Sequence, residues 1–222
     1  MATVGFIGSG RMGGTVARLS IAAGHTVILS NSRGPDTLKD LVTQLGPMAR
    51  ARPVDDAAED GDLVVVATPL AAIRHVPVRP VVDKAVLDAN NYHPQRDGHI
   101  AGLDSGQLTS SQLLQHHLPG ASVVKVFNNI HYRHLLHLAR PSGDPIRSYL
   151  PIAGDNAQAL SAVTQFLDSI GYGAADYGPL AESWRQQPGQ PVYGAPYGSM
   201  DNESGRPAGE QTIRTALAAA VR

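Results

Sequence analysis

Short apolar runs alternate with helix-like segments along most of this chain, and the alternation predicts a parallel sheet covered by helices. The clearest run is 62–68, which is unbroken, apolar and rich in β-branched residues. Such a run is typical of a parallel strand that is buried on both faces. The helix-like segments end at glycines, for example Gly24 and Gly46, which suit the left-handed position after a helix. We therefore predict an α/β fold with a doubly wound sheet.

The same pattern sets the order of the expected elements up to the middle of the chain. The predicted strands are residues 4–7, 25–30, 49–54, 62–68, 85–90 and 121–130. The predicted helices are residues 15–23, 36–45, 55–60 and 109–118. Residues 94–110 contain three spread glycines and are predicted to form an exposed loop.

The turn after the first predicted strand reads Gly8-Ser9-Gly10-Arg11-Met12-Gly13. A G-x-G-x-x-G run between a strand and a helix is the fingerprint of dinucleotide binding. Gly8 allows a tight turn, Gly10 lets the backbone approach a pyrophosphate, and Gly13 lets the helix lie close to the strand. The helix N-terminus favours negative charge. The fold expected from this turn is a Rossmann-type doubly wound, mostly parallel sheet with helices on both faces and a small C-terminal extension.

The end of the second predicted strand indicates which dinucleotide is bound. NAD sites usually place Asp or Glu about 20 residues after the glycines, where it accepts the ribose hydroxyls. Here the chain reads Ser30-Asn31-Ser32-Arg33, and the first carboxylate follows at Asp36. These side chains can donate to a 2′-phosphate, which a carboxylate would repel. The sequence therefore predicts NADP(H), the alternative being a polar turn before a helix.

Two further strand ends are expected at the same edge of the sheet, because ligands of such folds bind at the carboxyl ends of the strands. We expect Thr68 and Pro69 beside the nicotinamide half of the cofactor. Asn90 can donate and accept hydrogen bonds to a carboxamide or ribose. Ordinary strand-to-helix and loop-forming roles are the alternatives for these residues.

Composition narrows the function classes. The 222 residues carry a net charge of −1, so no global field gathers nucleic acid or an anionic membrane. The chain has no cysteine, which excludes disulfides, thiolate catalysis and cysteine zinc sites. No apolar run is long enough to cross a bilayer, and a strand begins too early for a signal peptide. We expect a cytoplasmic protein without nucleic-acid or membrane partners.

The chain is expected to divide near residue 146. Residues 1–146 form the predicted NADP-binding unit, and residues 147–222 an extension that completes the sheet and the substrate cleft within one compact domain. The extension is predicted to contain strands at 148–153 and 172–177 and helices at 156–170 and 208–221. Residues 185–207 are too apolar for a free tail, so we expect them to pack as a lid or across a dimer partner.

Four motifs together resemble one enzyme family, the NADPH-dependent reductases of coenzyme F420. They are Gly5–Gly14, Ser30–Arg33, Ala67–Pro69 and Val123–Asn129, and the similarity spans roughly residues 3 to 180 in order. The first part is shared with hydroxyacid and phosphogluconate dehydrogenases and imine reductases. The resemblance implies a small, commonly dimeric Rossmann protein that passes a hydride between nicotinamide C4 and deazaflavin C5.

The resemblance also implies roles for single residues. Ser32 and Arg33 would bind the 2′-phosphate, and the pyrophosphate would be held by Gly8, Ser9, Gly10, Arg11 and Met12. One departure concerns Phe127–His131, which lacks the His-Thr pair of the best-known archaeal members. The identity of the hydride partner therefore stays open.

The substrate side is the least readable part of the sequence. The residues expected there are Lys125, Asn128, Asn129, His131 and Trp184. Lys125 has an equal alternative as an edge residue, and for Trp184 a buried anchor is favoured over stacking on a flat ring. His131, His134 and His137 do not share one helical face, and no carboxylate lies among them, so we expect no metal site.

No catalytic residue is assigned, because hydride transfer between two flat rings needs positioning rather than a nucleophile. One alternative is an NADPH-dependent reductase of a small imine or carbonyl, which needs a proton donor. Its candidates are Tyr92, His93, Lys125 and His131. A second alternative is an NADP-binding sensor without catalysis, since a fold alone does not establish chemistry.

Overall fold

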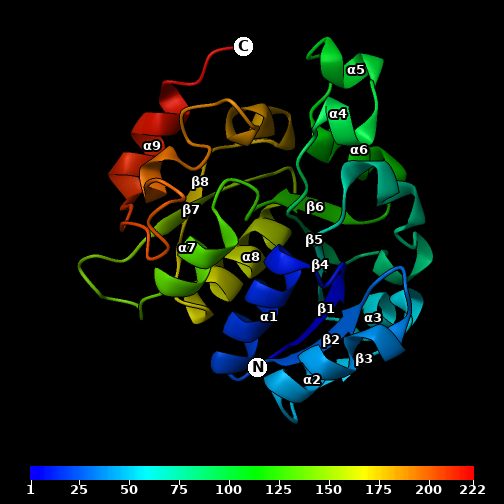
Figure 1. The fold of residues 1–222 in the computed structure, drawn as a ribbon. Coiled ribbons are helices and arrows are strands. Elements are labelled where there is room, and N and C mark those ends of the chain that lie inside the picture. The colour runs from blue at the N-terminus through cyan, green and yellow to red at the C-terminus, as the bar shows by residue number, and fades with distance from the viewer.

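The computed structural model describes all 222 residues and is built on one eight-stranded sheet (Figure 1). The strand order is β3-β2-β1-β4-β5-β6-β7-β8, and every neighbouring pair is parallel except β6 and β7. The strands are β1 (Thr3–Ile7), β2 (Thr26–Ser30), β3 (Ala49–Ala51), β4 (Leu63–Val66), β5 (Ala85–Asp88), β6 (Ser122–Lys125), β7 (Tyr149–Gly154) and β8 (Gly173–Asp176). This is the predicted Rossmann-type, mostly parallel sheet.

Nine α-helices and five short 3₁₀ helices connect the strands. The α-helices are α1 (Arg11–Ala22), α2 (Lys39–Leu45), α3 (Val54–Asp60), α4 (Pro94–Asp97), α5 (Ala101–Asp104), α6 (Ser110–His117), α7 (Tyr132–His137), α8 (Ala157–Ser169) and α9 (Glu210–Ala218). The 3₁₀ helices are η1 (Pro35–Leu38), η2 (Leu70–His75), η3 (Arg79–Val81), η4 (Leu180–Gln186) and η5 (Ala195–Tyr197). None of these helices has the length and apolar character that crossing a membrane demands.

The helices cover both faces of the sheet, and the alternation of side chains along β4 shows why. Val65 faces the larger core, which includes residues of α1, α8 and α9. Val64 and Val66 face the smaller core, which includes residues of α3 and α6. Successive strand residues point to opposite faces, so a strand covered on both sides has to be apolar throughout. The unbroken run in the sequence has this cause.

Two segments differ from the sequence-based expectation. The predicted loop at 94–110 contains α4 and α5. Pro94 starts α4, and the Asp97 side chain at its end accepts a hydrogen bond from the His93 N–H at 2.9 Å. The strand predicted at 121–130 ends at Lys125, because Phe127 has a φ of +67° that no extended strand accommodates.

The C-terminal extension joins the same sheet. β7 pairs antiparallel with β6, and β8 then runs parallel to β7. In Figure 1 these two strands lie at the edge opposite to β2 and β3, with α9 beside them. The predicted strands at 148–153 and 172–177 and the predicted helix between them at 156–170 are confirmed, and the two strands extend the sheet.

Two adjacent glycines in α1 serve different purposes. A Cβ at Gly13 would lie 2.1 Å from the carbonyl oxygen of Gly8, so only glycine lets the helix approach the preceding turn. A Cβ at Gly14 would meet nothing closer than 3.6 Å, the guanidinium of Arg18.

This contrast gives a matched pair of variants. Gly13→Ala should lower the free energy of unfolding by about 3 kcal/mol because backbone has to move. Gly14→Ala should raise it by about 0.5–1 kcal/mol through helix propensity. Urea denaturation followed by circular dichroism measures both values. Equal effects of the two substitutions would contradict the close approach at Gly13.

Candidate functional site

The turn after β1 is held by backbone and hydroxyl contacts to the end of β2. Gly8 has a φ of +98°, and its N–H donates to the Ser30 carbonyl oxygen at 3.1 Å. The Ser9 hydroxyl donates to the same oxygen at 2.9 Å. Ser30 itself is fully buried, and its hydroxyl donates to the Phe6 carbonyl at 2.6 Å. Ser30 thus supports the turn from the protein interior. The prediction that it contacts the cofactor directly is wrong, because its side chain is buried and bonded to the main chain.

A cavity of about 320 Å³ opens above this turn, and we call it the nucleotide cavity. Its lining joins the ends of β1, β2 and β4. The lining residues are Ile7, Gly8, Ser9, Gly10, Asn31, Ser32, Arg33, Val54, Ala67, Thr68, Pro69, Ala72, His75 and Val76. The structure therefore brings the predicted glycine turn, the polar turn after β2 and the Thr68-Pro69 pair into one hollow.

The nucleotide cavity fits an NADP(H) molecule on several grounds. A Cβ at Gly10 would meet no protein atom within 4 Å, so the space over this turn is open to a ligand. Gly10 precedes α1 without any side-chain cap, which leaves N–H groups at a positive helix end for phosphates. Arg33 makes no ion pair, and no carboxylate lines the cavity, as a 2′-phosphate requires.

Two buried polar atoms beside this cavity lack a partner. They are the hydroxyl oxygen of Thr68 and the side-chain nitrogen of Asn90. The Asn90 side-chain oxygen accepts from the Thr68 N–H at 2.9 Å, which fixes the amide orientation. Buried polar groups are almost always paired, so both atoms mark a place for a polar ligand group.

A second cavity of about 260 Å³ lies beside the first, past the same turn. Arg11 and Met12, predicted with the pyrophosphate residues, line this second cavity instead of the nucleotide cavity, because they start α1 and face α7. The other lining residues are Ala89, Asn91, Asn128, Asn129, Ile130, His131, Tyr132, His134, Tyr193, Gly194, Gly198 and Met200. The predicted substrate residues Asn128, Asn129 and His131 are thus brought together.

The amides of the second cavity are locked by hydrogen bonds within the protein. The Asn128 Nδ2 donates to the Asn91 side chain at 3.1 Å and to the Gln186 carbonyl at 2.7 Å. The Asn129 Nδ2 donates to the Val192 carbonyl at 3.1 Å. Phe127, directly before them, has the left-handed φ described above, a strain typical of functional sites.

The two histidines of this cavity carry unpaired ring nitrogens. His134 Nε2 lies 2.8 Å from the Asn202 carbonyl oxygen, so it donates and leaves Nδ1 free. Burial lowers the pKa of His131, and the nearby His134, Arg133 and Arg11 lower it further, so its ring is neutral at pH 7. His137 is exposed and does not line the cavity.

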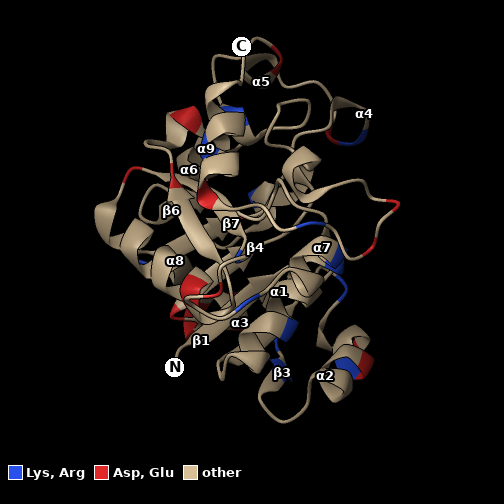
Figure 2. Cartoon of the chain, turned by 90° about the vertical axis from the view of Figure 1, so that its left-hand side faces the viewer, with Lys and Arg blue, Asp and Glu red and all other residues tan.

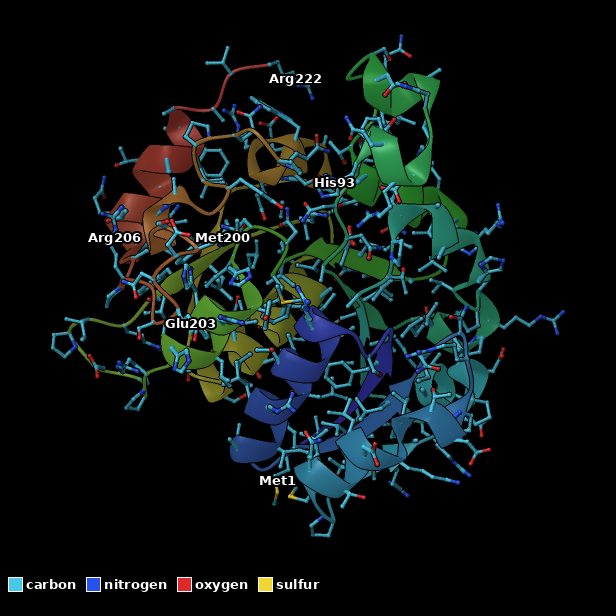
Figure 3. The ribbon with its side chains drawn as sticks, in the orientation of Figure 1. Met1, His93, Met200, Glu203, Arg206 and Arg222 are labelled. Carbon is cyan, nitrogen blue, oxygen red and sulfur yellow. The ribbon has the colours of Figure 1, made fainter.

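The segment at 190–206 forms one wall of the second cavity, and the sequence did not indicate which of its residues line that cavity. Tyr193 lines the second cavity, and its hydroxyl oxygen accepts a hydrogen bond from the Asn91 Nδ2 at 3.4 Å. Burial raises the pKa of Tyr193, so the phenol stays protonated. Glu203 pairs with Arg133 of α7, and Figure 3 shows Met200 and Glu203 along this segment beside α7. The apolar and aromatic composition of residues 185–207 indicated that this segment packs against the rest of the chain. It did not indicate which residues it contacts.

Two predicted substrate residues lie elsewhere. Lys125 is fully buried and lines neither cavity, because its ammonium is enclosed by groups at the end of β5. Trp184 lies in a separate hollow near the C-terminus, where it stacks against Arg185 and Arg222. Neither meets a substrate directly in this arrangement. Charges of both signs are scattered over the chain, without one dominant sign (Figure 2).

Comparisons with known proteins show which chains this protein is similar to. The family described as "NADP oxidoreductase coenzyme F420-dependent" matches residues 3–92. A hypothetical protein from Sinorhizobium meliloti is 32% identical, with a TM-score of 0.73, covering 86% of this chain and 93% of that chain. A search of the curated proteins gave no match.

Two more distant structures share the fold. One is from Arthrobacter sp. FB24, provisionally described as an F420-dependent NADP-reductase, with 21% identity, a TM-score of 0.69, and coverage of 83% of this chain and 88% of that chain. The other is 3-hydroxyisobutyrate dehydrogenase from Mycobacterium tuberculosis, with 15% identity, a TM-score of 0.58, and coverage of 82% and 56%.

The open space at Gly10 makes a direct test of the nucleotide cavity. Gly10→Ala should leave the free energy of unfolding within about 1 kcal/mol of the parent, since the methyl group touches no protein atom. It should weaken NADPH binding by about tenfold or more, because the methyl group would stand where phosphates approach. Fluorescence titration with NADPH measures this affinity. Unchanged affinity would place the pyrophosphate elsewhere.

Proposed function

Since this chain belongs to the family of coenzyme F420-dependent NADP oxidoreductases, we propose that it transfers a hydride between NADP(H) and coenzyme F420. Family membership makes it an NADP-dependent oxidoreductase with a Rossmann-type fold. The identity of the second substrate is the proposed part. In that reaction NADPH gives up a hydride, which is one proton with two electrons, and F420 takes up this hydride and a further proton from solvent.

The observation that carries the proposal is the pair of cavities on either side of one turn. Gly8, Ser9 and Gly10 line the nucleotide cavity, and the next residues, Arg11 and Met12, line the second. A cofactor bound along the first cavity would therefore present its far end toward the second. Hydride transfer needs such adjacency, because the two reacting carbons have to approach to roughly 3–3.5 Å.

On the nucleotide side, each residue has a stated task. Ser32 and Arg33 bind the 2′-phosphate, and the free N–H groups at the start of α1 bind the pyrophosphate. Asn90 and Thr68, whose unpaired polar atoms were described above, bind the nicotinamide half. The bound cofactor supplies the hydride, and the protein supplies the positions.

The walls of the second cavity suit a flat ring. No carboxylate lines this cavity, and the burial-lowered pKa of His131 leaves that ring neutral. Its walls combine the apolar Met12 and Ile130 with the amides of Asn128 and Asn129. Apolar walls exclude water around the transfer, and fixed polar groups orient a ring edge. We also propose a homodimer, as the family resemblance implies.

The proposed reaction has a direct assay. Purified protein is mixed with NADPH and oxidised F420, and the deazaflavin absorbance is followed. We expect catalytic bleaching that depends on both substrates. No bleaching by a protein that binds NADPH tightly would refute the F420 assignment, and the search for the acceptor would then turn to imines and carbonyls.

The choice of NADP over NAD is tested at Arg33. Arg33→Ala should weaken NADPH binding by roughly 10- to 100-fold, since a charge-assisted contact contributes about 1.5–3 kcal/mol. NADH binding should change by less than about twofold. The exposed Arg79, on η3 and outside both cavities, provides the control substitution Arg79→Ala. Equal losses for NADPH and NADH at Arg33 would count against this position of the 2′-phosphate.

A further inference from the structure

An ion pair without any solvent contact lies below the two cavities. Lys125 at the end of β6 faces Asp88 at the end of β5, and both side chains are fully buried. Their charged atoms are 3.2 Å apart. Burial lowers the pKa of Lys125, and the Asp88 carboxylate opposes that shift. Buried ion pairs contribute little net stability, because desolvation offsets their attraction, so this pair calls for another explanation.

The contacts of the pair converge on the main chain of Asn90. Lys125 Nζ donates to the Asn90 carbonyl oxygen at 2.5 Å. The Asn90 N–H donates to Asp88 Oδ1 at 2.9 Å. The hydroxyl of Ser111, on α6, donates to Asp88 Oδ2 at 2.7 Å and holds the carboxylate from the other side. Both polar groups of the Asn90 main chain are therefore fixed by one pair of opposite charges.

The side chain of Asn90 is fixed as well, but only through its oxygen. Its Oδ1 accepts from the Thr68 N–H, so its Nδ2 points away from that contact. The residue is 1% exposed, and this nitrogen has no partner in the protein. Thr68 lines the nucleotide cavity and lies against the glycine turn, since a Cβ at Gly8 would be 3.0 Å from its methyl group.

We propose that Lys125 is a positioning residue, which together with Asp88 holds Asn90 so that its free amide binds the nicotinamide end of NADP(H). The proposal rests on the NADP part of the proposed function and not on the identity of the hydride acceptor. Lys125 touches neither ligand. It acts through the Asn90 carbonyl, which lies between its ammonium and the strand-end loop that faces the cofactor.

The test compares two ligands that differ only by the nicotinamide ring, NADPH and 2′-phospho-ADP-ribose. The Kd of 2′-phospho-ADP-ribose divided by the Kd of NADPH, both measured by calorimetry on the full chain, reports the nicotinamide contribution to binding. Asn90→Ala and Lys125→Met should each reduce this ratio by about tenfold and leave the affinity for 2′-phospho-ADP-ribose within about twofold. The double variant Asn90→Ala/Lys125→Met should reduce the ratio no further than Asn90→Ala alone, because both substitutions remove the same interaction.

Lys84 provides the matched control. Its ammonium also donates to main-chain carbonyls, those of Ala58 and Glu59, but at α3 and away from Asn90. Lys84→Met should leave the ratio unchanged. Equal losses for both ligands in Lys125→Met would assign Lys125 a general structural role. An unchanged ratio, or losses that multiply in the double variant, would also overturn the proposal.

Lys125→Met leaves the Asp88 carboxylate buried without its opposite charge, so the stability of this variant has to be controlled. The variant Asp88→Asn/Lys125→Met removes both charges and should restore the thermal midpoint while the nicotinamide contribution stays low. A stable Asp88→Asn/Lys125→Met variant that keeps the full nicotinamide contribution to binding would refute the positioning role of Lys125. If the parent protein bound neither ligand, the proposed function itself would fail. If the parent bound both ligands but did not reduce F420, the comparison of Kd ratios would still test the role of Lys125.

Discussion

The constraint on which this structure depends is that backbone groups just past the ends of buried parallel strands have no ladder partner and no water. Such groups have to be paired. Here side chains from neighbouring strand ends pair with them: Asn90 with the Thr68 N–H, and Lys125 with the Asn90 carbonyl. The residues that pair with these backbone groups therefore also form the floor of the site, because the site lies at the same carboxyl ends of the strands.

The two halves of the chain contribute unequally to the site above that edge. The nucleotide cavity is formed entirely by residues before position 80, from the glycine turn, the β2 end and the segment after β4. The second cavity joins the start of α1 to the loops after β5 and β6 and to the segment around Tyr193. This late segment packs against α7, where Glu203 pairs with Arg133 and the Asn202 carbonyl accepts a hydrogen bond from His134.

Local chemistry explains which features the sequence could predict. The glycine turn, the Arg33 turn and the Thr68 strand end each have their own signal within a few residues, and all three line the nucleotide cavity. Lys125 and Ser30 were placed on the correct strands, but a sequence does not state whether a polar group faces a ligand or a buried carbonyl. The contact of Asn91 with Tyr193 joins residues 102 positions apart, so only the folded chain reveals it. The homodimer and the cytoplasmic location stay predictions.

No residue lines both cavities. The wall of the second cavity that comes from Tyr193, Gly194 and Met200 is thus encoded separately from the pocket for the nucleotide. Substitutions in that late segment therefore change the second cavity without touching the lining of the nucleotide cavity. The two cavities are in this sense separable modules, and variants at Tyr193, Gly194 and Met200 would vary one cavity while the other keeps its lining.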